Sequence, residues 1–89
     1  MWAKLIIMQG NVHYITGVAH LSDYRLKIWF WDKSVKVVDL QPYLDGLIFE
    51  PLKNPDFFRK VTVNPDIDTI VWPNNADFAP EFLYEIGYA

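Results

Sequence analysis

The chain has 89 residues, the length of one small domain, and 52% of them are hydrophobic and 17% aromatic. It contains no cysteine, which excludes disulfides, thiolate metal ligands and cysteine nucleophiles and favours a reducing, cytoplasmic location. The net charge of −3 argues against direct nucleic-acid binding, which needs a basic face.

The charge is spread unevenly along the chain. Residues 1–36 carry five basic and two acidic side chains, whereas residues 37–89 carry three basic and nine acidic ones. We interpret the acidic C-terminal part as a solvated face. The alternative is a surface for a basic protein partner.

Residues 1–13 are interpreted as an N-terminal extension, and residues 14–89 as a single domain. The apolar run from Leu5 to Met8 is far shorter than the ~20 residues of a membrane span, so we expect no membrane association. It also lacks the length and cleavage site of a signal peptide. The extension is predicted to be an edge strand or a mobile arm, or to reflect a start codon assigned too early.

Three antiparallel strands are predicted in the first half of the domain. Residues 14–21 are rich in β-forming side chains, and residues 24–31 alternate between two kinds of side chain. Ser22-Asp23 and Asp32-Lys33 are turn sequences, and residues 34–38 return as the third strand.

The second half is predicted to hold short helices and a β-hairpin. The expected elements are a helical turn packed on the sheet through Leu47, Ile48, Phe49 and Leu52, a helix over 55–59, strands over 61–63 and 69–72, and a helix from Pro80 to Gly87. The fold class is therefore α+β, with an antiparallel sheet of about five strands, short helical turns and a C-terminal helix.

The alternation in residues 24–31 supplies the first candidate site. Tyr24, Leu26, Ile28 and Phe30 share the core face, so the opposite face carries a stripe of two cations and two indoles: Arg25, Lys27, Trp29 and Trp31. Two tryptophans on a polar face are expected to be covered by the N-terminal extension, by a second copy or by a foreign protein. Single-stranded nucleic acid is a less favoured ligand, because few cations lie nearby.

The second candidate is the loop Trp72-Pro73-Asn74-Asn75-Ala76-Asp77, which joins the last strand to the last helix. As a recognition loop it would use Trp72 as an anchor and Asn74 and Asp77 as polar contacts. We favour the structural interpretation, in which Trp72 fills the core and the two polar side chains bond to backbone amides.

These segments resemble the domain of unknown function 2442 family over about residues 14–86. The resemblance rests on Asp23-Tyr24-Arg25-Leu26, Val35 to Leu40, Phe49-Glu50-Pro51-Leu52, Asn54 to Phe58, and above all Val71-Trp72-Pro73-Asn74 with Ala76-Asp77. The family usually has glycine where this chain has Lys33 and Asn75, which leaves the turn at Lys33 open.

The resemblance implies a small bacterial protein without established chemistry. Relatives are sometimes fused to a helix-turn-helix DNA-binding domain, and their genes often neighbour another small gene, as in a toxin–antitoxin pair. No catalytic residue is carried over from the family.

Neither a metal site nor a cofactor is expected. His13 and His20 lack the spacing of a metal motif. The pairs Asp66/Asp68 and Glu81/Glu85 lie in a turn and on a wet helix face. We therefore expect a non-enzymatic protein-interaction domain, self-associating or antitoxin-like. The alternatives are an accessory module of a transcription regulator and, more weakly, a small enzyme.

Overall fold

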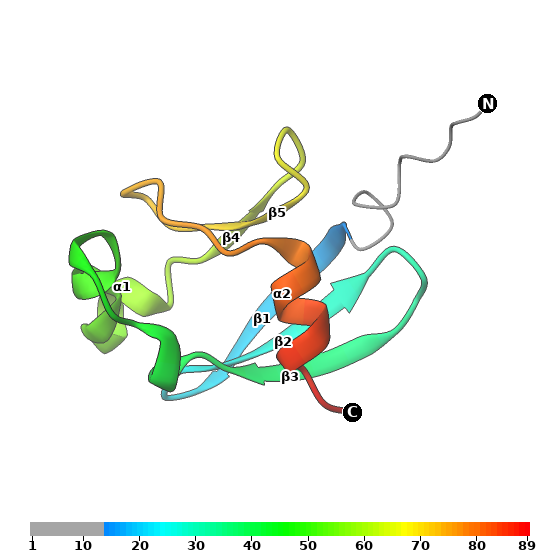
Figure 1. The fold of residues 1–89 in the computed structure, drawn as a ribbon, viewed down its shortest axis with the longest axis horizontal. Coiled ribbons are helices and arrows are strands. Elements are labelled where there is room, and N and C mark those ends of the chain that lie inside the picture. The colour runs from blue at the N-terminus through cyan, green and yellow to red at the C-terminus, as the bar shows by residue number, and fades with distance from the viewer. Residues whose placement is uncertain (1–13) are drawn as a thin grey trace.

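The structure is a computed structural model that describes residues 14–89. The predicted extension, residues 1–13, lies outside the described residues. Figure 1 shows the described elements in chain order: β1 (Ile15–Ser22), β2 (Arg25–Phe30), β3 (Val35–Asp39), the 3-10 helices η2 (Gln41–Tyr43) and η3 (Leu47–Lys53), α1 (Pro55–Phe58), β4 (Thr62–Asn64), β5 (Thr69–Val71) and α2 (Pro80–Ile86).

This order confirms the predicted α+β class with five antiparallel strands. The strands lie in two sheets, β1-β2-β3 and the β4-β5 hairpin. The hairpin lies beside β1, and a backbone hydrogen bond of 3.0 Å from Ile15 N to Asp68 O connects the two sheets. With three residues in each hairpin strand, a continuous five-stranded ladder does not form.

The two-residue alternation of β2 is confirmed. Leu26, Ile28 and Phe30 are buried, whereas Arg25 and Lys27 are exposed. We call the first side of the three-stranded sheet its inner face and the other its outer face. The core therefore forms on the inner face alone.

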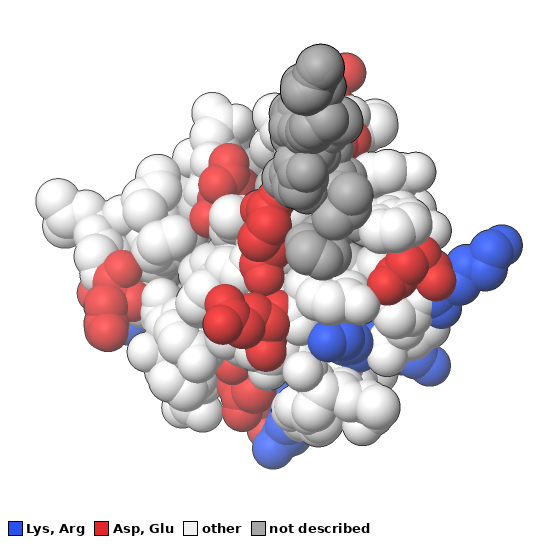
Figure 2. Space-filling view, turned by 45° about the vertical axis from the view of Figure 1, so that its right-hand side comes forward, with Lys and Arg blue, Asp and Glu red and all other residues white. Residues whose placement is uncertain are grey.

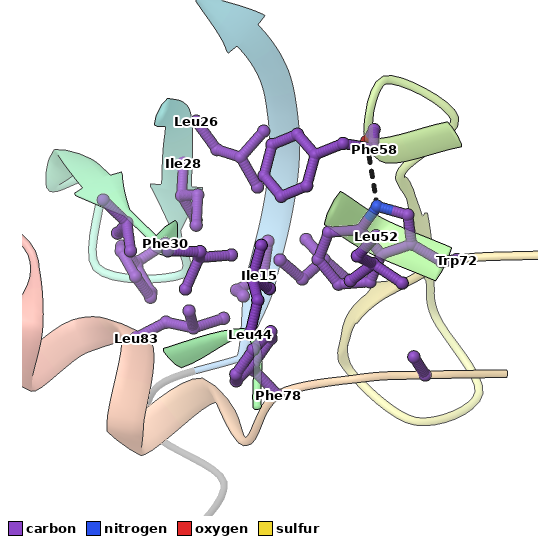
Figure 3. Close-up of a cluster of buried hydrophobic side chains, with 14 residues drawn as sticks. Ile15, Leu26, Ile28, Phe30, Leu44, Leu52, Phe58, Trp72, Phe78 and Leu83 are labelled. Atoms are coloured by element: carbon purple, nitrogen blue, oxygen red, sulfur yellow. Dashed lines mark hydrogen bonds between the residues drawn. The ribbon is translucent and has the colours of Figure 1, made fainter. Parts of the chain in front are cut away.

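The core lies between the inner face and the C-terminal half of the chain (Figure 3). Phe58, Trp72 and Leu83 are each at most 1% exposed and come from α1, the residue after β5, and α2. Helix α2 crosses in front of the sheet in Figure 1, and the ring of Tyr84 meets Phe30 edge-on, with centroids 5.0 Å apart. Aromatic packing of this kind adds about 0.5–1.5 kcal/mol beyond burial.

The expected packing of η3 is partly wrong. Leu52 is buried and Phe49 is half-buried, but Leu47 is 92% exposed and Ile48 48% exposed. The segment forms a 3-10 helix, which has three residues per turn, so positions 49 and 52 share one face while 47 and 48 point elsewhere.

The sequence did not decide the conformation of the turn between β2 and β3. In the structure, Lys33 adopts the left-handed conformation there, at φ 72°. Asp32 supports it: its Oδ1 accepts hydrogen bonds from Ser34 N at 2.9 Å and from Ser34 Oγ at 2.6 Å. Asn75 adopts φ 69°, as expected for an asparagine in glycine's place. The turn between β2 and β3 thus forms without glycine, and the hydrogen bonds of the Asp32 side chain stabilise it.

Candidate functional site

The outer face brings the first predicted stripe together with its neighbours on β1 and β3. Strand register places Gly17 and Val35 beside Trp29, and Ala19 and Val37 beside Lys27. The small residues lie on β1 and the valines on β3. The outer face is therefore a mostly apolar surface centred on the Trp29 indole.

Trp29 is half-buried by its own sheet. A Cβ atom added at Gly17 would lie 3.3 Å from Trp29 Cε3, so the indole rests directly on the backbone of β1. The hydroxyl of Thr16 donates to Trp29 O at 3.3 Å. The contact with Gly17 places the indole against β1, and the side chain of Trp29 remains partly exposed.

Trp31 follows the last residue of β2 and extends the apolar surface towards the turn between β2 and β3. Its side chain is 39% exposed, and its ring centroid lies 6.5 Å from that of Tyr14, which is 42% exposed. Trp31 N donates to Tyr14 O at 3.0 Å. Two large aromatic side chains therefore remain accessible at this end.

The other end of the stripe is charged. Lys27 Nζ lies 5.3 Å from the centroid of the Trp29 ring, within cation–π range. Arg25 Nε lies 4.0 Å from Asp39 Oδ2, and both side chains are exposed, so the pair contributes little to stability. Both cations are exposed, and Arg25 also donates to Ser22 Oγ at 3.2 Å.

The structure places Trp72 of the second candidate in the core. Its indole is 1% exposed, and its Nε1 donates to Phe58 O at 2.8 Å (Figure 3). A buried side chain cannot anchor a partner without unfolding, so Trp72 does not contribute to any surface.

Asn74 and Asp77 differ in their availability. Asn74 Nδ2 donates to Ile48 O at 2.9 Å, and its Oδ1 accepts from Ala76 N at 3.2 Å, so the amide fastens the loop to η3. Asp77 pairs with Val71 through the backbone and its side chain is exposed. The loop brings one exposed acidic side chain to the surface, separate from the stripe.

Of the two histidines, His20 has a local structural role. His20 Nε2 lies 3.0 Å from Asp23 O, and its ring meets Phe58 edge-on; His13 lies outside the described residues. Within residues 14–89 no three His, Asp or Glu side chains gather in a way that could hold a metal ion. In the same part of the chain, no helix has the length and apolar character needed to cross a membrane.

Two titrating side chains join the β2–β3 hairpin to α2. Hydrogen bonds from Ser34 and from the Tyr84 hydroxyl lower the pKa of Asp32 to about 2. The same carboxylate raises the pKa of Tyr84. Lys36 Nζ lies 3.9 Å from the centre of the Tyr84 ring and donates to Tyr84 O at 2.8 Å. The two pKa shifts therefore result from contacts that fasten α2 to the β2–β3 hairpin.

Two surface features escaped the sequence analysis. A pocket of about 280 Å³ lies among Tyr24, Gln41, Leu44, Asp45 and Lys53, and the Tyr24 hydroxyl donates a hydrogen bond to Lys53 O. The second is the exposed pair Leu47 and Ile48. Neither has a sequence motif, because both depend on where the 3-10 helices turn.

On the face shown in Figure 2, acidic side chains gather in the middle and basic ones lie towards the lower right.

Comparison with known proteins identifies a family and a fold. The model of the family described as "Protein of unknown function (DUF2442)" matches residues 15–89. No curated protein matches the chain. A crystal structure from Nitrosomonas europaea, named "putative DNA binding protein", superposes with a TM-score of 0.73 at 23% identity. The match covers 82% of this chain and 47% of that one, so this chain spans about half of that protein's length.

Proposed function

Because the chain belongs to the DUF2442 family, whose function is unknown, we propose from its surface that it is a non-enzymatic protein-interaction domain. The outer face of the three-stranded sheet is the proposed contact surface. The observation that carries the proposal is the exposure of Trp31 and Tyr14 beside the half-buried Trp29.

Physical chemistry supports a binding role for such a surface. Tryptophan, tyrosine and arginine are enriched among the residues that contribute most to binding, and exposed aromatic patches often mark contact sites. The surface is also rigid, because Trp29 rests on Gly17 and Tyr14 is fastened to Trp31 through the backbone. A preorganised surface loses little conformational entropy on binding.

The specific form that we propose is the antitoxin-like or regulatory member of a two-gene pair. The test is co-purification at native expression level, comparing the wild type with the Trp29→Ala/Trp31→Ser variant. We expect a partner, the product of the neighbouring gene, to be recovered with the wild type and to be reduced at least tenfold with the variant.

The matched control is Leu47→Ala/Ile48→Ala, which removes exposed apolar side chains on η3, outside the sheet. It should recover the partner as well as the wild type does. Equal recovery by a folded Trp29→Ala/Trp31→Ser variant would reject the outer face as the contact surface. Recovery of the domain alone from the wild type would weaken the whole proposal.

A second candidate is an accessory module of a transcription regulator. The name and length of the Nitrosomonas europaea protein favour it, since the present fold corresponds to about half of that chain. In this form the domain contacts DNA only through its partner. The co-purified complex should then bind DNA with an affinity that falls steeply with salt, while the isolated domain should not bind.

A further inference from the structure

The pocket beside the 3-10 helices is bounded by segments that hydrogen bonds hold together. It holds about 280 Å³ and is lined by Tyr24, Gln41, Leu44, Asp45 and Lys53. The Tyr24 hydroxyl donates to Lys53 O at the end of η3, and Leu40 N, just before η2, donates to Tyr24 O at 2.9 Å. In Figure 1 these segments meet where the green part of the chain after β3 lies beside the turn between β1 and β2.

The side chains around the pocket have unused capacity to accept hydrogen bonds. Within residues 14–89 the side chains of Gln41 and Asp45 form no hydrogen bond or ion pair. The Tyr24 hydroxyl already donates its proton to Lys53 O, so it can only accept a further hydrogen bond. A carboxylate, an amide and a phenolic oxygen therefore favour a ligand that donates.

The charges and the size of the pocket narrow the class of ligand. Lys53 Nζ lies 3.0 Å from Glu50 Oε2, so a neighbouring carboxylate compensates its charge. Asp45 has no such partner in the described part of the chain, which leaves one uncompensated negative charge. Leu44, 2% exposed, supplies an apolar wall. The volume lies below the roughly 300–1,000 Å³ of sites for drug-sized ligands, so the ligand is a small cation.

We propose that this pocket binds a small primary alkylamine in its protonated form. The ammonium group has three N–H donors, which contact the Asp45 carboxylate and the unused oxygens of Gln41 and Tyr24, and the alkyl chain lies on Leu44. None of the five lining residues belongs to the outer face. The site is therefore additional to the proposed protein contact, and each proposal can fail without the other.

A ¹H–¹⁵N NMR titration of the full chain with butylammonium chloride, at constant ionic strength, tests the site. The backbone amides of Gln41 and Asp45 and the side-chain amide of Gln41 should shift and saturate in roughly the millimolar range, because an exposed ion pair contributes little by itself. The indole signal of Trp72, hydrogen-bonded in the core, should not move. Tetramethylammonium has the same charge without an N–H donor and should bind about tenfold more weakly. Equal binding of tetramethylammonium, or tighter binding of acetate through Lys53, would overturn the proposal.

The Asp45→Asn variant should bind butylammonium about tenfold more weakly, because it loses a charge-assisted hydrogen bond. The matched control is Asp66→Asn, which makes the same change in the exposed turn between β4 and β5, outside the pocket, and should bind as the wild type does. An unchanged Trp72 indole signal verifies that both variants are folded. Equal weakening in the two variants would show a general attraction of cations to an acidic protein. That result, or full binding by Asp45→Asn, would overturn the assignment of the site.

Discussion

The indoles of Trp72 and Trp31 occupy opposite environments in one small domain. Trp72 is 1% exposed and donates to Phe58 O, whereas Trp31 is 39% exposed. Replacing Trp72 by Phe leaves a buried carbonyl without its donor and opens a void. We expect Trp72→Phe to lower the free energy of unfolding by about 2–3 kcal/mol.

Trp31→Phe is the matched control for this substitution, because it makes the same chemical change at the surface. It should alter the free energy of unfolding by less than about 0.5 kcal/mol. Urea denaturation of both variants measures the difference. Equal destabilisation by the two would contradict the assignment of one indole to the core and the other to the surface.

The second residue-scale prediction concerns the carboxylate of Asp32. Its largest stabilising contact is the Ser34 hydroxyl, and Tyr84 contributes less. Ser34→Ala keeps the backbone hydrogen bond and should therefore raise the pKa of Asp32 from about 2 only part of the way towards 3.8, and Tyr84→Phe should raise it less. Carbon-13 NMR titration of the carboxyl group measures both values, and the opposite order would contradict this account of the turn.

The sign of the linked stability change follows from the lowered pKa. A carboxylate that is favoured in the folded state stabilises the protein above its ordinary pKa, and that stabilisation disappears as the pH falls. The difference in stability between the wild type and Asp32→Asn should therefore shrink as the pH falls from about 4 to about 2. Denaturation at several pH values measures it.

At the scale of an element, the β2–β3 hairpin depends on a lysine in a glycine conformation. Lys33 at φ 72° carries a steric cost that glycine avoids. We expect Lys33→Gly to raise the free energy of unfolding by about 0.5–1 kcal/mol. Lys60→Gly, at a position without positive φ, should instead lower it by up to about 1 kcal/mol, because glycine adds freedom to the unfolded chain. Thermal or urea unfolding distinguishes the two, and a loss of stability in both would show that Lys33 is not strained.

The elements themselves could be predicted because their signals are local. Alternation in β2, asparagine and proline before α1, and proline and glycine around α2 each depend on residues within a few positions. The division into two sheets could not be predicted, since it depends on how the β4–β5 hairpin meets β1. The exposure of Leu47 was missed because its apolar spacing fits an α-helix and a 3-10 helix alike.

At the scale of the whole molecule, the stripe could be placed on one face from the sequence alone. The support that makes it a rigid surface could not, because Gly17 lies in β1 and Tyr14 directly precedes it, both far from Trp29 in the sequence. The loop ending at Asp77 was harder to interpret: only tertiary contacts show that Trp72 and Asn74 fasten the chain internally. Of the two candidate sites, the stripe on β2 is therefore a surface, and the loop over residues 72–77 is mainly a structural connection.

The central claim is that a protein partner contacts the outer face of the three-stranded sheet. The most direct test is a ¹H–¹⁵N NMR titration of the labelled domain with the partner recovered by co-purification. The indole signals of Trp29 and Trp31 and the amides of Lys27 and Val37 should shift, while the indole of Trp72 should not. Shifts confined to the loop around Asp77, with Trp29 and Trp31 unchanged, would contradict the account.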